Sequence, residues 1–377
     1  MTPRFADCRS VETFGLAEIP AYHYGDQAFH GIQRRKDFDR GILLTRIAQK
    51  PSANAKPIAL IVGISGQDGA YLSKLLLEHG YEVHGTSRDA QASSFANLTR
   101  LGIREKIKLW SMSTTDFRSV LQVLLKVQPS EVYNLSGQSS VGLSFDQPVE
   151  TLESVATGTL NLLEGIRFSG LPVRLYSAGS GEVYGDTAGI PATEEMRFAP
   201  RSPYAVAKAA AYWQVTNYRE AYQLYACTGI LFNHESPLRP ERYVTRKIVA
   251  AACRIADGSG ETLVLGNMDI ARDWGWAPEY VEAMWLMLQQ ETADDYIVAT
   301  GVTRTLEEFV EAAFSCVGLA WRDHVKSDPS LYRPADIRHG AANPTKANAK
   351  LGWQASKKGN DVVASMVKAE SRSEARA

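Results

Sequence analysis

The stretch Ile58–Gly69, which reads Ile-Ala-Leu-Ile-Val-Gly-Ile-Ser-Gly-Gln-Asp-Gly, decides the fold of the residues around it. It begins with a continuous apolar run, which is typical of a strand buried on both faces. A glycine-rich turn follows, then a helical stretch at Tyr71–His79 and a second strand at Tyr81–Thr86. Together these segments predict a strand–helix–strand unit of about 30 residues.

Strands and helices continue to alternate along the chain. Further strands are expected at Glu131–Leu135, Val173–Ser177, Ala226–Phe232 and Tyr296–Ala299. Further helices are expected at Ser119–Val127, Val149–Phe168, Tyr204–Gln223, Thr245–Ala256, Pro278–Gln290 and Leu306–Val317. This alternation predicts an α/β fold: a doubly wound parallel Rossmann sheet with a smaller, interleaved C-terminal substrate-binding domain.

The bulk composition excludes several classes of protein. The chain has 377 residues, 45% of them apolar, and a formal net charge of −1, so no global field would recruit nucleic acid or an anionic membrane. No apolar run approaches the roughly 20 residues that span a bilayer, and the first residues lack the apolar core of a secretory signal. The four cysteines lack the spacing of a zinc site or a disulfide framework. We therefore expect no metal and a cytoplasmic location.

The glycine-rich turn has the context of a dinucleotide-binding loop, because it follows a buried strand and opens a helix. The glycines allow a tight turn and close approach of the backbone to a pyrophosphate, and the helix amino terminus offers N–H donors. The spacing is GxxGxxG rather than GxGxxG. The predicted cofactor-binding residues of this turn are Gly63, Ser65, Gly66, Gln67, Asp68 and Gly69.

The end of the second strand should select between NAD and NADP. Arg88 would neutralise a 2′-phosphate, whereas Asp89 would suit a ribose diol. Arg88 comes first after the strand, so the sequence favours NADP and places Arg88 among the cofactor-binding residues.

Four side chains form a candidate catalytic set. Tyr204 and Lys208 lie at i and i+4, on one face of an expected helix. A nearby ammonium and a nicotinamide cation are expected to lower the pKa of the tyrosine, so that it can take a proton from a sugar hydroxyl. Ser180 and Glu182 follow the strand Val173–Ser177, at the strand end where such sheets bind ligands. Ser180 can hydrogen-bond the same substrate oxygen, and Glu182 adds a carboxyl group that simple ketoreductases do not need.

This set resembles the extended short-chain dehydrogenases, and the added glutamate resembles their sugar-nucleotide 4,6-dehydratases. The chain is most similar to the GDP-mannose 4,6-dehydratases, over residues of about 57 to 365. The stretches that carry the resemblance are Gly66–Gly69, Val132–Leu135, Gly229–Pro237, Val244–Lys247, Arg272–Gly275, Tyr280–Leu288, Val298–Gly301 and Tyr332–Pro334. There are departures: Ser180 stands where threonine is common, and Met112-Ser113 stands where the family usually has Gly-Asp near adenine.

The resemblance implies the roles of further residues. Asn233 is expected to touch the substrate, and Lys247, Arg272 and Arg333 to hold the GDP part. Asp336 is the nearest match to an acidic nucleotide-binding residue. Leu135 joins the cofactor-binding residues together with Tyr204 and Lys208, and Ser139, Gly266 and Glu182 join the substrate-binding residues.

The resemblance also implies the reaction, which is conversion of GDP-mannose to GDP-4-keto-6-deoxymannose with loss of water and internal hydride transfer through NADP. The alternatives are the same chemistry on another GDP-sugar such as a manno-heptose, a GDP-4-keto-6-deoxymannose reductase, and a non-catalytic NADP-sensing protein. A homodimer or homotetramer is expected.

The expected domain organisation follows from these assignments. Residues 57–232 should form the NADP-binding domain, with a segment near 278–300 returning to it, and residues 233–365 should mainly bind the GDP-sugar. Residues 1–56 lack a core pattern and are expected to be a disordered extension, with a functional arm as the alternative. Residues 366–377 are expected to be a charged tail.

Overall fold

A computed structural model describes residues 56–374, so the extension expected at 1–56 lies outside the described residues except for Lys56. Its main element is a parallel sheet of seven strands in the order β10-β6-β5-β4-β1-β2-β3. The strands are β1 (Ile58–Val62), β2 (Glu82–Ser87), β3 (Lys108–Ser111), β4 (Glu131–Asn134), β5 (Arg174–Ala178), β6 (Ala226–Leu231) and β10 (Tyr296–Val298). The predicted doubly wound α/β sheet is confirmed.

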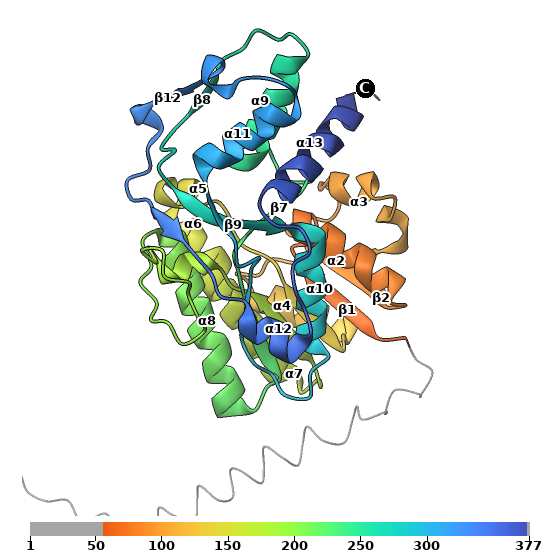
Figure 1. The fold of residues 1–377 in the computed structure, drawn as a ribbon. Helices are drawn as coiled ribbons and strands as arrows, with labels where there is room; N and C mark the ends of the chain where they lie inside the picture. Colours follow the sequence, from red (N-terminus) through yellow and green to blue (C-terminus); the bar gives the residue numbers. More distant parts are fainter. Residues whose placement is uncertain (1–55, 375–377) are drawn as a thin grey trace, which may run out of the picture. The chain divides into compact units, whose positions relative to one another are not determined.

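Helices cover both faces of this sheet (Figure 1). One face packs against α2 (Gln67–Glu78) and α10 (Ala277–Leu288), and the other against α4 (Phe117–Val127), α7 (Gly158–Ser169) and α8 (Pro203–Tyr222). Strand β1 shows why: Ala59 and Ile61 lie in the first core, whereas Leu60 and Val62 lie in the second. Side chains alternate along a strand, so a continuous apolar run fills both cores. Full burial of each such Leu, Ile or Val contributes about 1.5–3 kcal/mol.

The residues after β6 form a smaller part with its own core. Strand β9 (Ala271–Trp276) pairs with β7 (Asn233–Glu235), β11 (Thr303–Thr305) and β13 (His339–Gly340), and β8 (Leu263–Leu265) pairs with β12 (Val325–Ser327). Three helices pack together beside them: α9 (Val244–Ala256), α11 (Leu306–Cys316) and α13 (Asn360–Glu374). The segment α10–β10 returns to the main sheet.

The structure differs from the sequence prediction at several helices. Helix α2 begins at Gln67 rather than Tyr71, directly after Gly66, so the glycine turn is itself the helix start. The helix expected at 149–168 is divided into α6 (Pro148–Leu152), a π-helical turn (Glu153–Thr157) and α7. Helix α13 runs through most of the expected charged tail, where Met366 and Val367 are buried. The sequence analysis did not predict three short helices: α3 (Ala96–Arg100), α5 (Val141–Asp146) and α12 (Thr345–Leu351).

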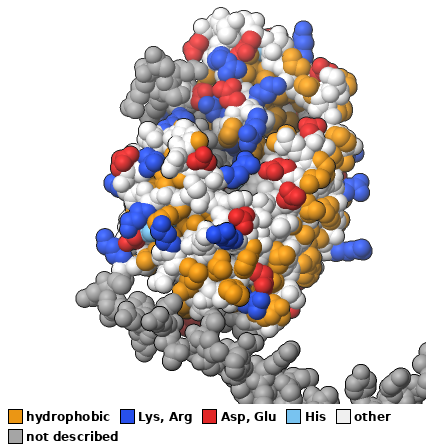
Figure 2. All heavy atoms as spheres, turned by 180° about the vertical axis from the view of Figure 1, so that it is seen from behind, with side chains coloured by type: hydrophobic (Ala, Val, Ile, Leu, Met, Phe, Trp, Pro, Cys, Tyr) orange, Lys and Arg blue, Asp and Glu red, His pale blue; other side chains and the backbone are white. Residues whose placement is uncertain are grey.

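The distribution of charged side chains on the surface agrees with the net charge of −1. Basic and acidic side chains are interspersed on the face drawn in Figure 2, with Lys and Arg side chains beside a hollow in its upper half. Hydrophobic side chains gather over the lower part of that face. Among the described residues, no helix is long and apolar enough to cross a membrane.

Candidate active site

A pocket of about 780 Å³ lies at the carboxyl ends of β1, β4, β5 and β6, and residues of the smaller part line its other side. This is the edge where doubly wound sheets bind ligands. The pocket brings together all the predicted site residues except Arg88. They are Gly63, Ser65, Gly66, Gln67, Asp68, Gly69, Leu135, Ser139, Ser180, Glu182, Tyr204, Lys208, Asn233, Lys247, Gly266, Arg272, Arg333 and Asp336.

The turn between β1 and α2 fits a dinucleotide. Gly63 has a φ of +88°, and a Cβ there would lie 2.8 Å from the Leu135 carbonyl oxygen. A Cβ at Gly69 would lie 2.6 Å from the Cα of Ile64, so this glycine allows close packing of helix on strand. Among the described residues, no side chain caps the amino end of α2 at Gly66. The first N–H groups of the helix are therefore available to an anion.

Arg88 lies just beyond β2, outside the residues that line the pocket. Its side chain is 84% exposed, and its Nη1 atom lies 3.5 Å from Glu150 Oε1. The neighbouring Asp89 carboxylate accepts hydrogen bonds from the backbone N–H groups of Gln91 at 2.8 Å and Ala92 at 3.1 Å. The Asp89 carboxylate is therefore fixed by hydrogen bonds to nearby backbone N–H groups, whereas the Arg88 side chain extends into solvent.

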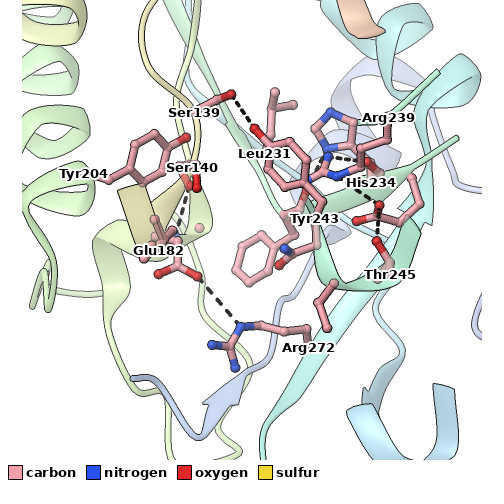
Figure 3. A pocket seen from close by; sticks show the side chains of 18 of the residues that line it. Ser139, Ser140, Glu182, Tyr204, Leu231, His234, Arg239, Tyr243, Thr245 and Arg272 are labelled. Atoms are coloured by element: carbon pink, nitrogen blue, oxygen red, sulfur yellow. Dashed lines mark hydrogen bonds and ion pairs between the residues drawn. The ribbon is translucent and has the colours of Figure 1, made fainter. Parts of the chain in front are cut away.

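The four candidate catalytic side chains come from two neighbouring elements. Ser180 and Glu182 stand at the 3₁₀ turn Gly181–Tyr184 that follows β5, and the Ser180 hydroxyl accepts a hydrogen bond from the Glu182 N–H at 3.3 Å. Tyr204 and Lys208 lie in the first turns of α8, whose amino end is capped by Ser202. Lys208 Nζ donates to the Ala178 carbonyl at 2.7 Å and lies 5.8 Å from the centre of the Tyr204 ring. Tyr204 and Glu182 thus share one wall of the pocket (Figure 3).

Burial governs the titration of these groups. It raises the pKa of Tyr204 above its usual value, against a hydrogen bond with Ser180. Burial lowers the pKa of Lys208 to about 8, against the charge of Asp68. Burial also raises the pKa of Glu182, against the charges of Arg272 and Arg333. The protein groups by themselves therefore do not produce the lowered tyrosine pKa that the sequence analysis expects.

The basic side chains expected to hold the GDP part differ in how firmly neighbouring groups fix them in place. Arg272 is buried, with Nε 3.7 Å from Glu182 Oε1 and Nη2 3.3 Å from Asp336 Oδ1, and its Nη1 atom donates to the carbonyl of Ile337 at 2.8 Å. Lys247 Nζ donates to the Val264 carbonyl at 2.7 Å. Arg333 is less constrained, with Nη1 3.6 Å from Asp336 Oδ1 and its side chain 35% exposed. Arg272 is thus held between two carboxylates beside the catalytic wall.

Three side chains on the opposite wall were not predicted from the sequence: His234, Arg239 and Tyr243 (Figure 3). The Tyr243 and Ser139 hydroxyls are 2.8 Å apart, and the Arg239 guanidinium lies 4.0 Å from the centre of the Tyr243 ring. His234 Nε2 lies 2.9 Å from Asp68 Oδ2. His234 lies in the stretch Gly229–Pro237, which carries the family resemblance but in which only Asn233 was predicted to be a site residue. That resemblance could have indicated a role for His234 as well.

No metal ligand set accompanies these groups. Among residues 56–374, no group of three or more His, Cys, Asp or Glu side chains is placed to hold a metal ion.

The chain matches one family of known proteins over most of its length. The family model for GDP-mannose 4,6 dehydratase matches residues 60–366. GDP-mannose 4,6 dehydratase 1 of Arabidopsis thaliana is 47% identical over 309 residues, which cover 79% of this chain and 85% of that protein. GDP-mannose 4,6-dehydratase of Sinorhizobium fredii is 43% identical over 337 residues, which cover 83% and 96%.

Solved structures agree on the fold. A UDP-glucose 4-epimerase of Thermus thermophilus in complex with NAD superposes with a TM-score of 0.73 at 26% identity, covering 83% of this chain and 98% of that one. A dTDP-glucose 4,6-dehydratase of Bacillus anthracis, also with NAD, has a TM-score of 0.74 at 18% identity and covers 85% and 98%. The family model matches most of the chain, and the Arabidopsis and Sinorhizobium relatives are 47% and 43% identical to it. The chain therefore belongs to the GDP-mannose 4,6-dehydratase family.

Proposed function

We propose that this enzyme converts GDP-mannose to GDP-4-keto-6-deoxymannose with loss of water, using NADP as a bound hydride carrier. One observation carries the proposal: a largely buried carboxyl, that of Glu182, which is 15% exposed, stands on the same pocket wall as Ser180, Tyr204 and Lys208. The last three suffice to oxidise or reduce an alcohol. The carboxyl adds the acid–base function that an elimination of water requires.

Oxidation at C4 begins with the side chains of α8. Tyr204 takes the proton of the C4 hydroxyl, and the Ser180 hydroxyl, which is hydrogen-bonded to the tyrosine, holds the same oxygen. Lys208 is fixed by the Ala178 carbonyl, and its ammonium favours the phenolate. A dinucleotide held by the turn between β1 and α2 would supply the hydride chemistry, which is acceptance of a hydride from C4 and its return to C6.

Glu182 performs the elimination. The C4 ketone acidifies the C5 proton, which the carboxylate removes, and the resulting carboxylic acid protonates the departing C6 hydroxyl. C5 then regains a proton from solvent when a hydride is added at C6. A group that must accept and then donate a proton works best with a pKa near the operating pH. Burial raises the pKa of Glu182 in that direction. A reductase needs no such base at C5, which argues against that alternative.

The GDP part is assigned to the smaller part of the chain. Arg333, Lys247 and Arg272 supply the positive charge for the diphosphate, and Asn233 touches the sugar. Arginine suits this role because its planar guanidinium binds phosphate oxygens in pairs.

NADP is favoured over NAD by the end of β2. The exposed Arg88 side chain is able to turn toward a 2′-phosphate, while the Asp89 carboxylate is already held by the N–H groups of Gln91 and Ala92.

The enzyme is proposed to act as a homodimer or as a homotetramer built from such dimers. Val206 and Trp213 are exposed one heptad apart on α8, and Val149 and Leu152 are exposed on α6 beside it. Figure 1 shows these two helices at one side of the sheet. Exposed apolar side chains on two helices that pack together are typical of a self-association surface.

A cytoplasmic location is also proposed. Cys227 and Cys316 are free thiols, which suits a reducing compartment.

A panel of GDP-sugars tests the reaction. The purified enzyme should convert GDP-mannose to a product lighter by one water in mass spectrometry, without net consumption of NADP or NADPH. Faster dehydration of another GDP-sugar would establish the alternative substrate. Net oxidation of NADPH with a 4-keto sugar would establish a reductase.

A further inference from the structure

Asp68 places a carboxylate in the expected nucleotide-binding turn. It is the second residue of α2 and lines the pocket at the helix amino terminus, where a pyrophosphate is expected to bind. A carboxylate at this position would repel the phosphates unless a cation neutralised it.

His234 lies beside that carboxylate. Its Nε2 atom is 2.9 Å from Asp68 Oδ2, and its Nδ1 atom is 2.8 Å from the carbonyl oxygen of Phe232. A carbonyl and a carboxylate can only accept hydrogen bonds, so both ring nitrogens must carry protons. The geometry therefore describes a buried imidazolium paired with an aspartate.

The pair joins the two halves of the pocket. Gln67, next to Asp68, accepts a hydrogen bond from the Ser236 hydroxyl at 2.6 Å and donates to the His234 carbonyl at 3.2 Å. The His234 ring stacks on Tyr280 of α10, with centroids 4.6 Å apart. Asn233, the predicted sugar contact, is the neighbour of His234 on β7.

We propose that His234 is a positioning residue that neutralises Asp68 at the cofactor end of the pocket and fastens the Asn233-bearing strand to the cofactor turn. Through this pair, binding of the dinucleotide and placement of the sugar depend on one buried charge. The inference rests on the proposed dinucleotide site, and it does not depend on which sugar is dehydrated.

The titration of the pair supports this role. Burial alone would lower the pKa of His234, but the charge of Asp68 and the hydrogen bond to it raise that pKa above its usual value. Burial alone would raise the pKa of Asp68, but His234 brings it below its usual value. The other charged or titratable groups facing the ring are Arg239, whose charge lowers the histidine pKa, and the Tyr280 hydroxyl. Glu235 adjoins it on β7.

A double-mutant cycle tests the pair by measuring the dissociation constant of NADP in the parent, His234→Gln, Asp68→Asn and the double variant. Glutamine keeps a hydrogen-bond donor but carries no charge. His234→Gln should weaken NADP binding about tenfold to hundredfold in the parent, the usual range for a bond to a charged group. In the Asp68→Asn background, the same change should cost less than about threefold, because no carboxylate is left to neutralise.

His84→Gln is the matched control, since His84 is also buried beside a carboxylate, Glu82 at 2.7 Å, but does not line the pocket. It should leave the NADP dissociation constant unchanged. An equal loss for His234→Gln in both backgrounds would mean a packing role and would overturn the proposal. A parent enzyme that binds no dinucleotide would instead overturn the proposed function.

The pH dependence of binding gives a second measurement if His234→Gln fails to fold. The imidazolium is present below its raised pKa and is lost as the pH rises through it. NADP binding to the parent should therefore weaken across that pH step, and the step should be smaller in Asp68→Asn. Identical profiles for the two proteins would contradict the proposal.

Discussion

Glu182 and Arg272 form a loose ion pair across the pocket, with Glu182 Oε1 3.7 Å from Arg272 Nε. Arg272 also contacts Asp336 and two backbone carbonyls, so its guanidinium stays in place when Glu182 is protonated. Burial raises the pKa of Glu182, and the charge of Arg272 is the largest influence against it. The charge of Arg272 therefore opposes the effect of burial and favours the ionised form of Glu182.

Replacing Arg272 by glutamine should move the acid limb of the pH–rate profile upward. Without the opposing charge, the pKa of Glu182 should rise further, because a close positive charge favours the ionised carboxylate. Activity would then be lost first at low pH and partly recovered at high pH. Arg322→Gln, which breaks the exposed pair with Glu307, should leave the profile unchanged. A higher KM for the sugar nucleotide with an unmoved acid limb would mean that Arg272 only binds the anion.

Arg88→Ala should weaken NADP binding more than NAD binding. The guanidinium is proposed to neutralise the 2′-phosphate, which NAD lacks, so a loss of about tenfold or more is expected for NADP alone. Dissociation constants for both cofactors measure this, with the exposed Arg118→Ala as the control. Equal weakening of the two, or a parent enzyme that prefers NAD, would refute the assignment.

Trp213→Glu should disrupt self-association. The Trp213 side chain is 59% exposed on α8, and a charge in an apolar interface is costly to bury. Sedimentation or light scattering should show a smaller species at equal protein concentration, with the helical circular dichroism retained. An unchanged assembly would place the interface elsewhere, and a monomeric parent would refute the proposed self-association.

A truncated chain that begins at Lys56 should fold and turn over substrate like the full chain. The strands and helices that form the pocket lie between Ile58 and Gly340, inside the retained part. Melting temperature and kcat of the two proteins provide the comparison. A truncated enzyme that is insoluble or inactive would assign the first residues a structural role.

The catalytic side chains could be predicted from the sequence because they lie close together along the chain. Tyr204 and Lys208 are one helical turn apart, and Glu182 is two residues from Ser180, so their neighbourhood is encoded in short stretches. The continuous apolar run of β1 likewise predicted a strand with two covered faces. These features need no knowledge of distant contacts.

Long-range pairs were out of reach of the sequence. Asp68 and His234 are 166 positions apart, and Ser139 and Tyr243 are 104 apart, so only the folded chain shows that they meet. The three-residue strands β7 and β11 are too short for a periodic pattern. Residues 366–374 of helix α13 were predicted to belong to a charged tail because this part of the sequence is rich in charged residues. Met366 and Val367 nevertheless lie on a narrow apolar face that packs in the core.

The central claim is that Glu182 removes the C5 proton and protonates the departing C6 hydroxyl. Glu182→Gln should still bind the cofactor and sugar nucleotide, and Tyr204 and Lys208 should still oxidise C4. Dehydration should fall by roughly 10²–10⁴, the usual worth of a positioned acid or base. Tyr204→Phe is the matched control, because it should block the first hydride transfer as well.

Deuterium exchange at C5 in D₂O reports on the proton transfer that is assigned to Glu182. With GDP-mannose, the parent should place solvent deuterium at C5 of the product. Glu182→Gln should accumulate nicotinamide absorbance that does not decay, with no deuterium at C5, and Tyr204→Phe should show neither. If Glu182→Gln exchanges C5 and eliminates water near the parent rate, another group is the base and the account of the elimination is wrong.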